Sequence, residues 1–232
     1  MKKTRKIIVA IDGPAASGKS TTAREVAKKL GYTYIDSGAM YRAVTLQALH
    51  DKIPVEAQQE VAQLAQRIEM KFGWNNARTI IFLDGKDVSD KIRTPLIDQK
   101  ISPVAANPQV RKILVEKQQQ LGRSGGVVMD GRDIGTVVFP QAELKIFMMA
   151  RVQERAIRRQ KELEQKGIKV DLEQIVADME YRDQQDTGRS HGPLKKAADA
   201  VEIDTTGLTI PDQVERIYQL AVQKIAEVTG TV

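Results

Sequence analysis

Eight consecutive residues near the start of the chain have the types and spacing of a phosphate-binding loop: Gly13-Pro-Ala-Ala-Ser-Gly-Lys19-Ser20 matches G-x-x-x-x-G-K-[ST] in full. In such a loop, the glycines let backbone N–H groups turn toward phosphate oxygens, and the helix that follows presents its positive end to the same anion. We expect Lys19 to reach the β- and γ-phosphates of a nucleoside triphosphate and Ser20 to contact Mg²⁺. The motif leaves the acceptor of the phosphate open.

The nucleotide-binding residues that this motif predicts form one continuous segment: Gly13, Pro14, Ala15, Ala16, Ser17, Gly18, Lys19, Ser20 and Thr21. A GTPase would also need a base-reading N-K-x-D, which the sequence lacks. The motif therefore predicts binding of a nucleoside triphosphate, and the sequence does not favour a GTPase.

Arginines recur where a second anionic ligand would need them. Arg42 and Arg132 each lie just past a predicted strand, and open α/β sheets bind ligands beyond the carboxyl ends of their strands. Phosphoryl transfer brings two phosphates together, so cations must neutralise them, and the planar guanidinium binds phosphate oxygens bidentately. These arginines favour an acceptor that itself carries a phosphate.

Two predicted helices carry further charged stripes. One stripe, at i, i+4, i+7 and i+8, comprises Arg151, Arg155, Arg158 and Arg159. It is either a solvated face, on which Arg158 pairs with Glu154, or part of a mobile lid that excludes water from the reaction. The other stripe, at i, i+4 and i+7, comprises Arg182, Asp186 and Arg189, which share one face if the helix extends that far.

The segment "MDGRDIGT", Met129 to Thr136, follows a short apolar run and places two aspartates around Arg132. Asp130 comes directly after the predicted strand. It either lies near the magnesium ion or holds the phosphate loop, and the sequence leaves both alternatives open.

Composition limits the class of protein. The chain has 232 residues, 41% of them hydrophobic, 28% charged and 4% aromatic, with a net charge of +6. This balance suits a globular protein with an aliphatic core and favours anionic partners such as nucleotides or nucleic acid. The absence of cysteine excludes disulfides and cysteine nucleophiles, and the two histidines are too few for a histidine-rich metal site. We find neither a signal peptide nor an apolar run near the ~18 residues of a membrane span, so we expect a cytoplasmic protein.

Strands and helices alternate along most of the sequence, which predicts an α/β doubly wound sheet. The predicted strands are 7–11, 32–35, 125–129, 144–149 and 200–203. The predicted helices are 21–30, 37–51, 56–68, 107–121, 151–166, 171–185 and 211–227. The stretch "TIIFLDGKDVSD" differs, because a strand leads into the turn pair Asp84-Gly85. It predicts a small antiparallel insertion near residues 70–90.

Four stretches together resemble the bacterial cytidylate kinases of the nucleoside monophosphate kinase family: "IDGPAASGKS", "YIDSGAMYRA", "VVMDGRDIGTVVFP" and "YRDQQDTGRSHGPL". The resemblance covers essentially the whole chain. It implies a P-loop nucleoside triphosphate hydrolase fold: a five-stranded parallel sheet with helices on both faces, a small antiparallel insertion and a helical lid. It also implies three parts: a core (1–36, 111–150 and 191–232), a monophosphate-binding part (37–110) and a lid (151–190).

The implied reaction is ATP-dependent phosphorylation of CMP and dCMP to CDP and dCDP with Mg²⁺. The implied catalytic cations are Lys19, Arg132, Arg155, Arg158 and Arg159. The implied CMP-binding set is Ser37, Arg42 and Arg132 near the acceptor phosphate, Ser102, Arg111 and Asp133 at the cytosine, Arg182 and Asp186 at the sugar, and Arg189 toward base and phosphate. Ser20, with Asp130 acting indirectly, would serve the metal.

The sequence leaves two other functions open. One is another nucleoside monophosphate kinase, for adenylate or uridylate. The other is a basic RNA-binding protein that uses the loop for regulation, although the chain has few aromatic residues for base stacking. We expect small-molecule substrates, no nucleic acid or membrane partner, and a monomer.

Overall fold

The computed structural model describes residues 6–74, 79–165 and 167–230. Lys166, the last residue of one predicted helix, lies outside the described residues. The chain forms two compact units: one contains the residues up to Tyr34 and from Ser124 onward, and the other contains Ile35–Arg123. The expected three-part division stays a prediction.

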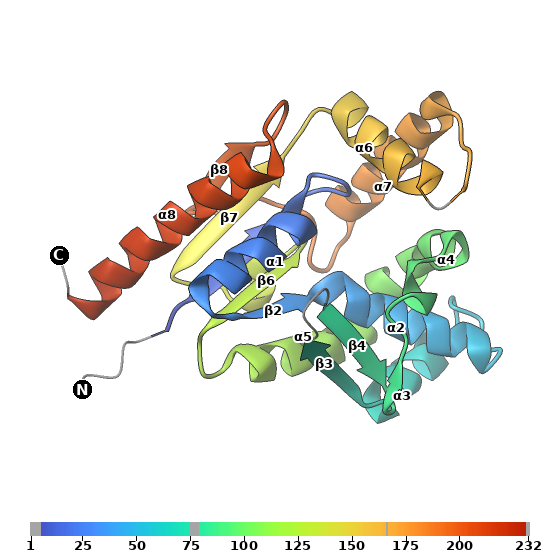
Figure 1. The fold of residues 1–232 in the computed structure, drawn as a ribbon. Helices are drawn as coiled ribbons and strands as arrows, with labels where there is room; N and C mark the ends of the chain where they lie inside the picture. The colour runs from blue at the N-terminus through green and yellow to red at the C-terminus, as the bar shows by residue number, and fades with distance from the viewer. Residues whose placement is uncertain (1–5, 75–78, 166, 231–232) are drawn as a thin grey trace. The chain divides into compact units, whose positions relative to one another are not determined.

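The first unit is organised around a five-stranded sheet with the order β2-β6-β1-β7-β8 (Figure 1). Its strands are β1 Ile8–Asp12, β2 Thr33–Asp36, β6 Val127–Gly131, β7 Leu144–Met149 and β8 Val201–Asp204. The central strand β1 pairs in parallel with β6 and with β7, and β7 pairs in parallel with β8. Because the central strands are covered on both faces, they are continuous apolar runs rather than alternating patterns.

The helices of this unit are α1 Lys19–Leu30, α6 Val152–Glu164, α7 Leu172–Gly188 and α8 Ile210–Thr229, with a short π-helix η2 at Ile134–Val138. Helices α1 and α8 lie side by side against the sheet (Figure 1). Val26 of α1 and Ile217 of α8 belong to the same buried cluster as Ile11. Helices α6 and α7 pack against each other through a small cluster of their own: Ala156, Leu163, Ile175 and Met179.

The second unit is mainly helical. Its helices are α2 Ser37–His50, α3 Gln58–Arg67, α4 Pro95–Ala106 and α5 Pro108–Gly122, with a 3-10 turn η1 at Lys91–Arg93. Its strands are β3 Met70–Trp74, β4 Thr79–Leu83 and β5 Lys86–Asp87, which form an antiparallel sheet. Asp84 and Gly85 have φ of 47° and 79°, which is the left-handed conformation that a tight hairpin turn requires. The predicted insertion is confirmed.

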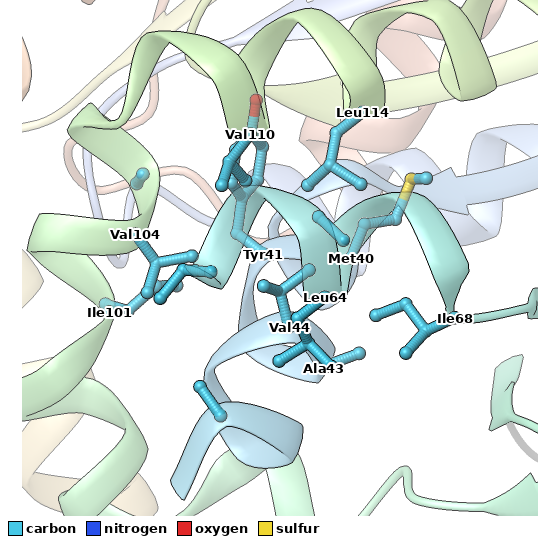
Figure 2. Close-up of a cluster of buried hydrophobic side chains, with 14 of the residues drawn as sticks. Met40, Tyr41, Ala43, Val44, Leu64, Ile68, Ile101, Val104, Val110 and Leu114 are labelled. Atoms are coloured by element: carbon cyan, nitrogen blue, oxygen red, sulfur yellow. The ribbon is translucent and has the colours of Figure 1, made fainter. Parts of the chain in front are cut away.

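The core of the second unit joins all four of its helices (Figure 2). Its labelled side chains are Met40, Tyr41, Ala43, Val44, Leu64, Ile68, Ile101, Val104, Val110 and Leu114. They are aliphatic apart from Tyr41, as the low aromatic content predicts.

The expected fold class is confirmed: a parallel sheet flanked by helices, with a small antiparallel sheet added. One helix was missed, α4. Thr94 caps its N-terminus and Pro95 occupies its first turn, but Pro103 lies in its interior. A proline there removes one backbone hydrogen bond and usually ends a helix, so the sequence pattern did not predict one.

Among the described residues, no helix combines the length and the apolar character that crossing a membrane would require.

Candidate functional site

The predicted phosphate loop connects β1 to α1, and close packing fixes its two glycines. A Cβ atom at Gly13 would lie 2.2 Å from the carbonyl oxygen of Met148, so no larger residue fits there. Gly18 has a φ of 92° and is the N-cap of α1. A Cβ atom at Gly18 would lie 2.8 Å from Oε1 of Gln213. The helix therefore begins directly behind the loop, and its free N–H groups face the anion that the loop would hold.

Two polar side chains of the loop lie inside it. Lys19 is 7% exposed, and its Nζ donates a hydrogen bond of 3.0 Å to the carbonyl oxygen of Pro14. The hydroxyl of Ser17 is buried and has no hydrogen-bond partner among the described residues. A lysine ammonium beside the start of a helix suits a polyanionic ligand, because both contribute positive charge at the same place.

Asp130 is bonded to the residue that follows the loop lysine. Its Oδ2 accepts a hydrogen bond of 2.7 Å from the Ser20 hydroxyl, and its Oδ1 accepts one of 2.7 Å from the Tyr34 hydroxyl. Asp130 thus contacts Ser20, the last residue of the loop motif. Both roles left open by the sequence, near the magnesium ion or holding the phosphate loop, stay predictions.

The residues present fit a magnesium ion that is held jointly with a nucleotide. Mg²⁺ prefers oxygen ligands and commonly takes only one or two from the protein, with phosphates and water supplying the rest. The Ser20 hydroxyl beside the Asp130 carboxylate is such a set. Within the described part of the chain, no three histidine, aspartate or glutamate side chains form a cluster that could hold a metal by themselves.

Asp12, at the end of β1, anchors the segment that follows β6. Its two carboxylate oxygens accept hydrogen bonds of 2.8 Å from the backbone N–H groups of Ile134 and Gly135. Burial raises the pKa of Asp12 to about 7, and the charge of Asp133 adds to this, while the two backbone bonds and Arg132 act in the opposite direction. This carboxylate fixes the backbone next to Arg132 and Asp133.

Because of Asp12, the free energy of unfolding should fall as pH rises from about 4 to about 7. The pKa of this carboxyl is 3.8 unfolded and about 7 folded, so between these values the folded state binds more protons. The contribution of Asp12 to the free energy of unfolding is therefore complete below its pKa in the unfolded state, and it is lost as pH rises through its pKa in the folded state. Between these two values, the free energy of unfolding falls by up to ~1.4 kcal/mol per pH unit. Urea denaturation at several pH values in this range measures the slope, which Asp12→Asn should flatten.

Asp199→Asn is the control for this experiment. Lys145 holds the pKa of Asp199 below its usual value, so this exposed group is ionised in both states above about pH 5. The slope of this variant should match that of the parent. Equal slopes in the parent and in Asp12→Asn would contradict the assignment to Asp12.

Asp186 joins two arginines of the predicted CMP-binding set. Its Oδ2 accepts a hydrogen bond of 2.6 Å from Nε of Arg132, and its Oδ1 pairs with Arg189. Helix α7 continues to Gly188, so Asp186 lies within it and Arg189 follows directly after its end. Arg182 lies half-buried on the same helix. The segment after β6 and the end of α7 are thus brought together by charge.

The arginines of α6 differ from one another in their contacts. Arg155 is 5% exposed and donates to the carbonyl oxygen of Ala15 in the phosphate loop at 3.2 Å and to Asp183 at 2.6 Å. Arg158 donates to the backbone oxygen of Thr205 at 2.7 Å, not to Glu154. Arg155 and Arg158 are therefore not part of a solvated helix face.

Arg159 pairs with Glu162 at 3.0 Å, an ordinary i, i+3 contact on the surface of α6. Arg151 precedes α6 and is exposed. Catalytic roles for Arg155, Arg158 and Arg159 stay predictions.

The second unit contains four residues of the predicted CMP-binding set. Ser37 is the buried first residue of α2, and Ser102 lies half-buried within α4. Arg42 donates to Asp98 at 2.6 Å. Arg111 is 4% exposed and lies over the Tyr41 ring, 5.8 Å from its centroid. A buried guanidinium on an aromatic face is held in a fixed orientation.

Sequence reasoning missed several residues that support the loop. Thr205 is fully buried, and its hydroxyl donates to the backbone oxygen of Ser17 at 2.9 Å. Gln213 is also fully buried and accepts a hydrogen bond of 2.8 Å from Thr22. A sequence signal existed for Asp12, a charged residue that ends an apolar strand. None existed for Thr205 or Gln213, which are far from the loop along the chain.

The phosphate loop lies between the first strand and the first helix. Its lysine is buried, and its serine is bonded to an aspartate of the neighbouring strand β6. These features define a P-loop nucleotide-binding protein. The comparisons narrow this class. The family model described as cytidylate kinase matches residues 9–223. A cytidylate kinase of Bacillus cereus (strain ATCC 10987 / NRS 248) is 48% identical over 216 residues, which are 93% of this chain and 96% of the relative.

A cytidylate kinase of Bacillus anthracis (strain CDC 684 / NRRL 3495) is 47% identical over 223 residues, covering 96% of this chain and 99% of the relative. The chain belongs to the cytidylate kinase family. It is accordingly an enzyme of the kinase class, as the sequence motifs predict.

Proposed function

We propose that the protein transfers the γ-phosphoryl group of ATP to the phosphate of CMP or dCMP, releasing ADP and CDP or dCDP. The observation that carries this proposal is the complete phosphate loop, with Ser20 bonded to buried Asp130, in a chain of the cytidylate kinase family. The other candidate functions have no comparable support.

The donor is held by the phosphate loop. Its backbone N–H groups and the start of α1 bind the phosphate oxygens, and Lys19 exchanges its contact with Pro14 for the β- and γ-phosphates. Mg²⁺, held by the Ser20 hydroxyl and backed by Asp130, would neutralise charge on these phosphates when bound. Arg155, already fixed to the backbone of Ala15, supplies a further positive charge beside the loop.

Transfer forms one bond and breaks one. An oxygen of the CMP phosphate attacks the γ-phosphorus in line, and the bond from that phosphorus to the bridging oxygen of ADP breaks. Negative charge then spreads over the oxygens between donor and acceptor, so fixed cations lower the barrier. Arg132 is the proposed clamp on the acceptor phosphate, with Ser37 and Arg42 as further ligands and Arg158 and Arg159 as lid cations.

Base selection follows from the hydrogen-bonding pattern of cytosine, which has an exocyclic amine beside ring N3 and O2 acceptors. We assign the amine to Asp133 and Ser102, which can accept, and the ring to Arg111, which can donate. Uracil has a carbonyl in place of the amine and would face Asp133 unfavourably. Arg182 and Asp186 are assigned to the sugar, and Arg189 is assigned to the base and the phosphate.

A substrate panel tests the proposal. ADP release is measured in a coupled assay with CMP, dCMP, UMP and AMP as acceptors, with no nucleic acid present. We expect CMP and dCMP to give the highest kcat/KM, UMP to be weaker, and AMP to be a poor acceptor. Turnover with AMP equal to or above that with CMP would refute the proposal and favour an adenylate kinase, whereas activity that required added RNA would favour the nucleic-acid alternative.

Three finer expectations accompany this function: a role in pyrimidine nucleotide metabolism, a cytoplasmic location, and a monomer without a nucleic-acid or membrane partner. The substrate chemistry supports the first. The other two stay predictions.

A further inference from the structure

The Asp130 carboxylate is bonded on both of its oxygens, and only one of these bonds leads to the phosphate loop. Ser20 donates to Oδ2 and the Tyr34 hydroxyl donates to Oδ1, each at 2.7 Å. Tyr34 is 4% exposed and Asp130 is 2% exposed. We propose that Tyr34 is a positioning residue for the divalent cation that accompanies ATP, because it fixes the carboxylate that orients the Ser20 hydroxyl. The inference rests on the ATP-binding part of the proposed function.

The argument begins with the serine hydroxyl, which has one proton and two lone pairs. When the proton is donated to Asp130, the lone pairs point away from the carboxylate and are available to a hard cation. An unbonded hydroxyl would instead rotate about its C–O bond and point its proton toward the cation in part of its orientations. The contact with Asp130 therefore selects the orientation that a metal ligand needs.

Asp130 can do this only if its own carboxylate is held still. The last torsion of an aspartate side chain is broad, so the orientation of the carboxylate plane depends on the groups that are bonded to it. The bond from Tyr34 to Oδ1 helps to fix that plane. A hydroxyl bonded to a carboxylate in a buried place is one of the stronger hydrogen bonds in proteins.

The backbone places Tyr34 for this role. Tyr34 belongs to β2 and Asp130 belongs to β6, and these strands are neighbours in the sheet. The Tyr34 ring is part of the hydrophobic cluster under α1, together with Val26 and Val128. Packing thus holds the ring while its hydroxyl reaches the carboxylate at the end of the next strand.

The test compares ATP binding with and without a divalent cation in Tyr34→Phe. Isothermal titration calorimetry gives the Kd of ATP in excess Mg²⁺ and again in EDTA, and the ratio of the two is the cation-dependent gain in affinity. Loss of a group that orients a metal ligand commonly costs 10–100-fold in metal affinity. We expect this gain to fall about tenfold in Tyr34→Phe. The Kd in EDTA should stay unchanged, and the Mg²⁺ concentration for half-maximal activity should rise.

Tyr32→Phe is the matched control. The Tyr32 hydroxyl accepts a hydrogen bond of 3.2 Å from the backbone N–H of Ile7, so the variant loses the same atom two positions away in the chain. It should keep the parent's cation-dependent gain. A gain in Tyr34→Phe equal to that of the parent would overturn the proposal. So would an equal loss of affinity in Mg²⁺ and in EDTA, since a purely structural role for Tyr34 predicts that result.

A double-mutant cycle with Ser20 gives a second test, because it measures the effect of Tyr34→Phe in a protein that lacks the Ser20 hydroxyl. In a Ser20→Ala protein, the hydroxyl that Asp130 orients is gone, so adding Tyr34→Phe should not reduce the cation-dependent gain further. Additive losses would overturn the proposal, and thermal unfolding of each variant separates these results from misfolding. The binding measurements need no acceptor, so they remain interpretable even if the acceptor is not CMP.

Discussion

Replacing Lys19 with alanine should lower the rate of phosphoryl transfer by about 10³-fold while leaving the fold intact. The ammonium is buried at the loop, and it donates a hydrogen bond to the Pro14 carbonyl oxygen. In the proposed reaction it neutralises charge that grows between the β- and γ-phosphates, which no water molecule in a closed loop can replace. The fold should survive because alanine is a good helix former at the start of α1.

The measurement is single-turnover transfer from radiolabelled ATP, combined with circular dichroism and thermal unfolding. Lys28→Ala is the matched control, since Lys28 is an exposed lysine on the same helix. This control should retain the parent's rate. Near-normal turnover in Lys19→Ala would mean that this loop does not bind the transferred phosphate.

The second large effect is expected at Asp133. Asp133→Ala should lower kcat/KM for CMP by about 100-fold and lower that for UMP much less, because a hydrogen bond to a charged group contributes about 1.5–3 kcal/mol and only cytosine offers the amine that makes it. Asp133 is 5% exposed, and its backbone is fixed because Asp12 holds the next two N–H groups. The side chain therefore has a defined direction, and the loss should appear as a change in base preference.

The measurement is kcat/KM for both nucleotides in the parent and in the variant. Asp133→Asn is the informative companion, since its amide keeps one acceptor and adds a donor that suits the uracil carbonyl. Preference for CMP should weaken in Asp133→Asn while overall activity is partly retained. If activity with CMP and UMP fell by the same factor in Asp133→Ala, Asp133 would serve the phosphate or the backbone rather than the base.

Most elements of the fold could be predicted because their signals are local. The apolar run at β1, the Asp84-Gly85 turn and the proline at the start of α5 each specify structure within a few residues. Helix α4 could not be predicted in this way. Its formation depends on Ile101 and Val104 packing into the core of the second unit, and this tertiary gain outweighs the local cost of Pro103.

The same division applies to the site. The phosphate loop is contiguous, so one motif revealed it. Arg132 and Asp186 are 54 residues apart, and Thr205 and Ser17 are 188 apart, so their pairing appears only when the sheet and helices are assembled. The sequence identifies Arg132, Asp186 and Arg189 as charged residues and places Asp186 and Arg189 on one face of a predicted helix. It gives no sign that Arg132 pairs with Asp186.

That ion cluster has a consequence for how the protein meets anions in solution. Arg132 and Arg189 carry two positive charges, and the single carboxylate of Asp186 cancels one of them. At long range, the three groups therefore act on an approaching anion as one net positive charge rather than two. We therefore expect the cluster to attract inorganic phosphate only weakly. In the proposed function, a nucleotide would bring hydroxyl donors for Asp186 together with a phosphate for the arginines, so it would satisfy all three groups at once, and the cluster would favour nucleotides over simpler anions.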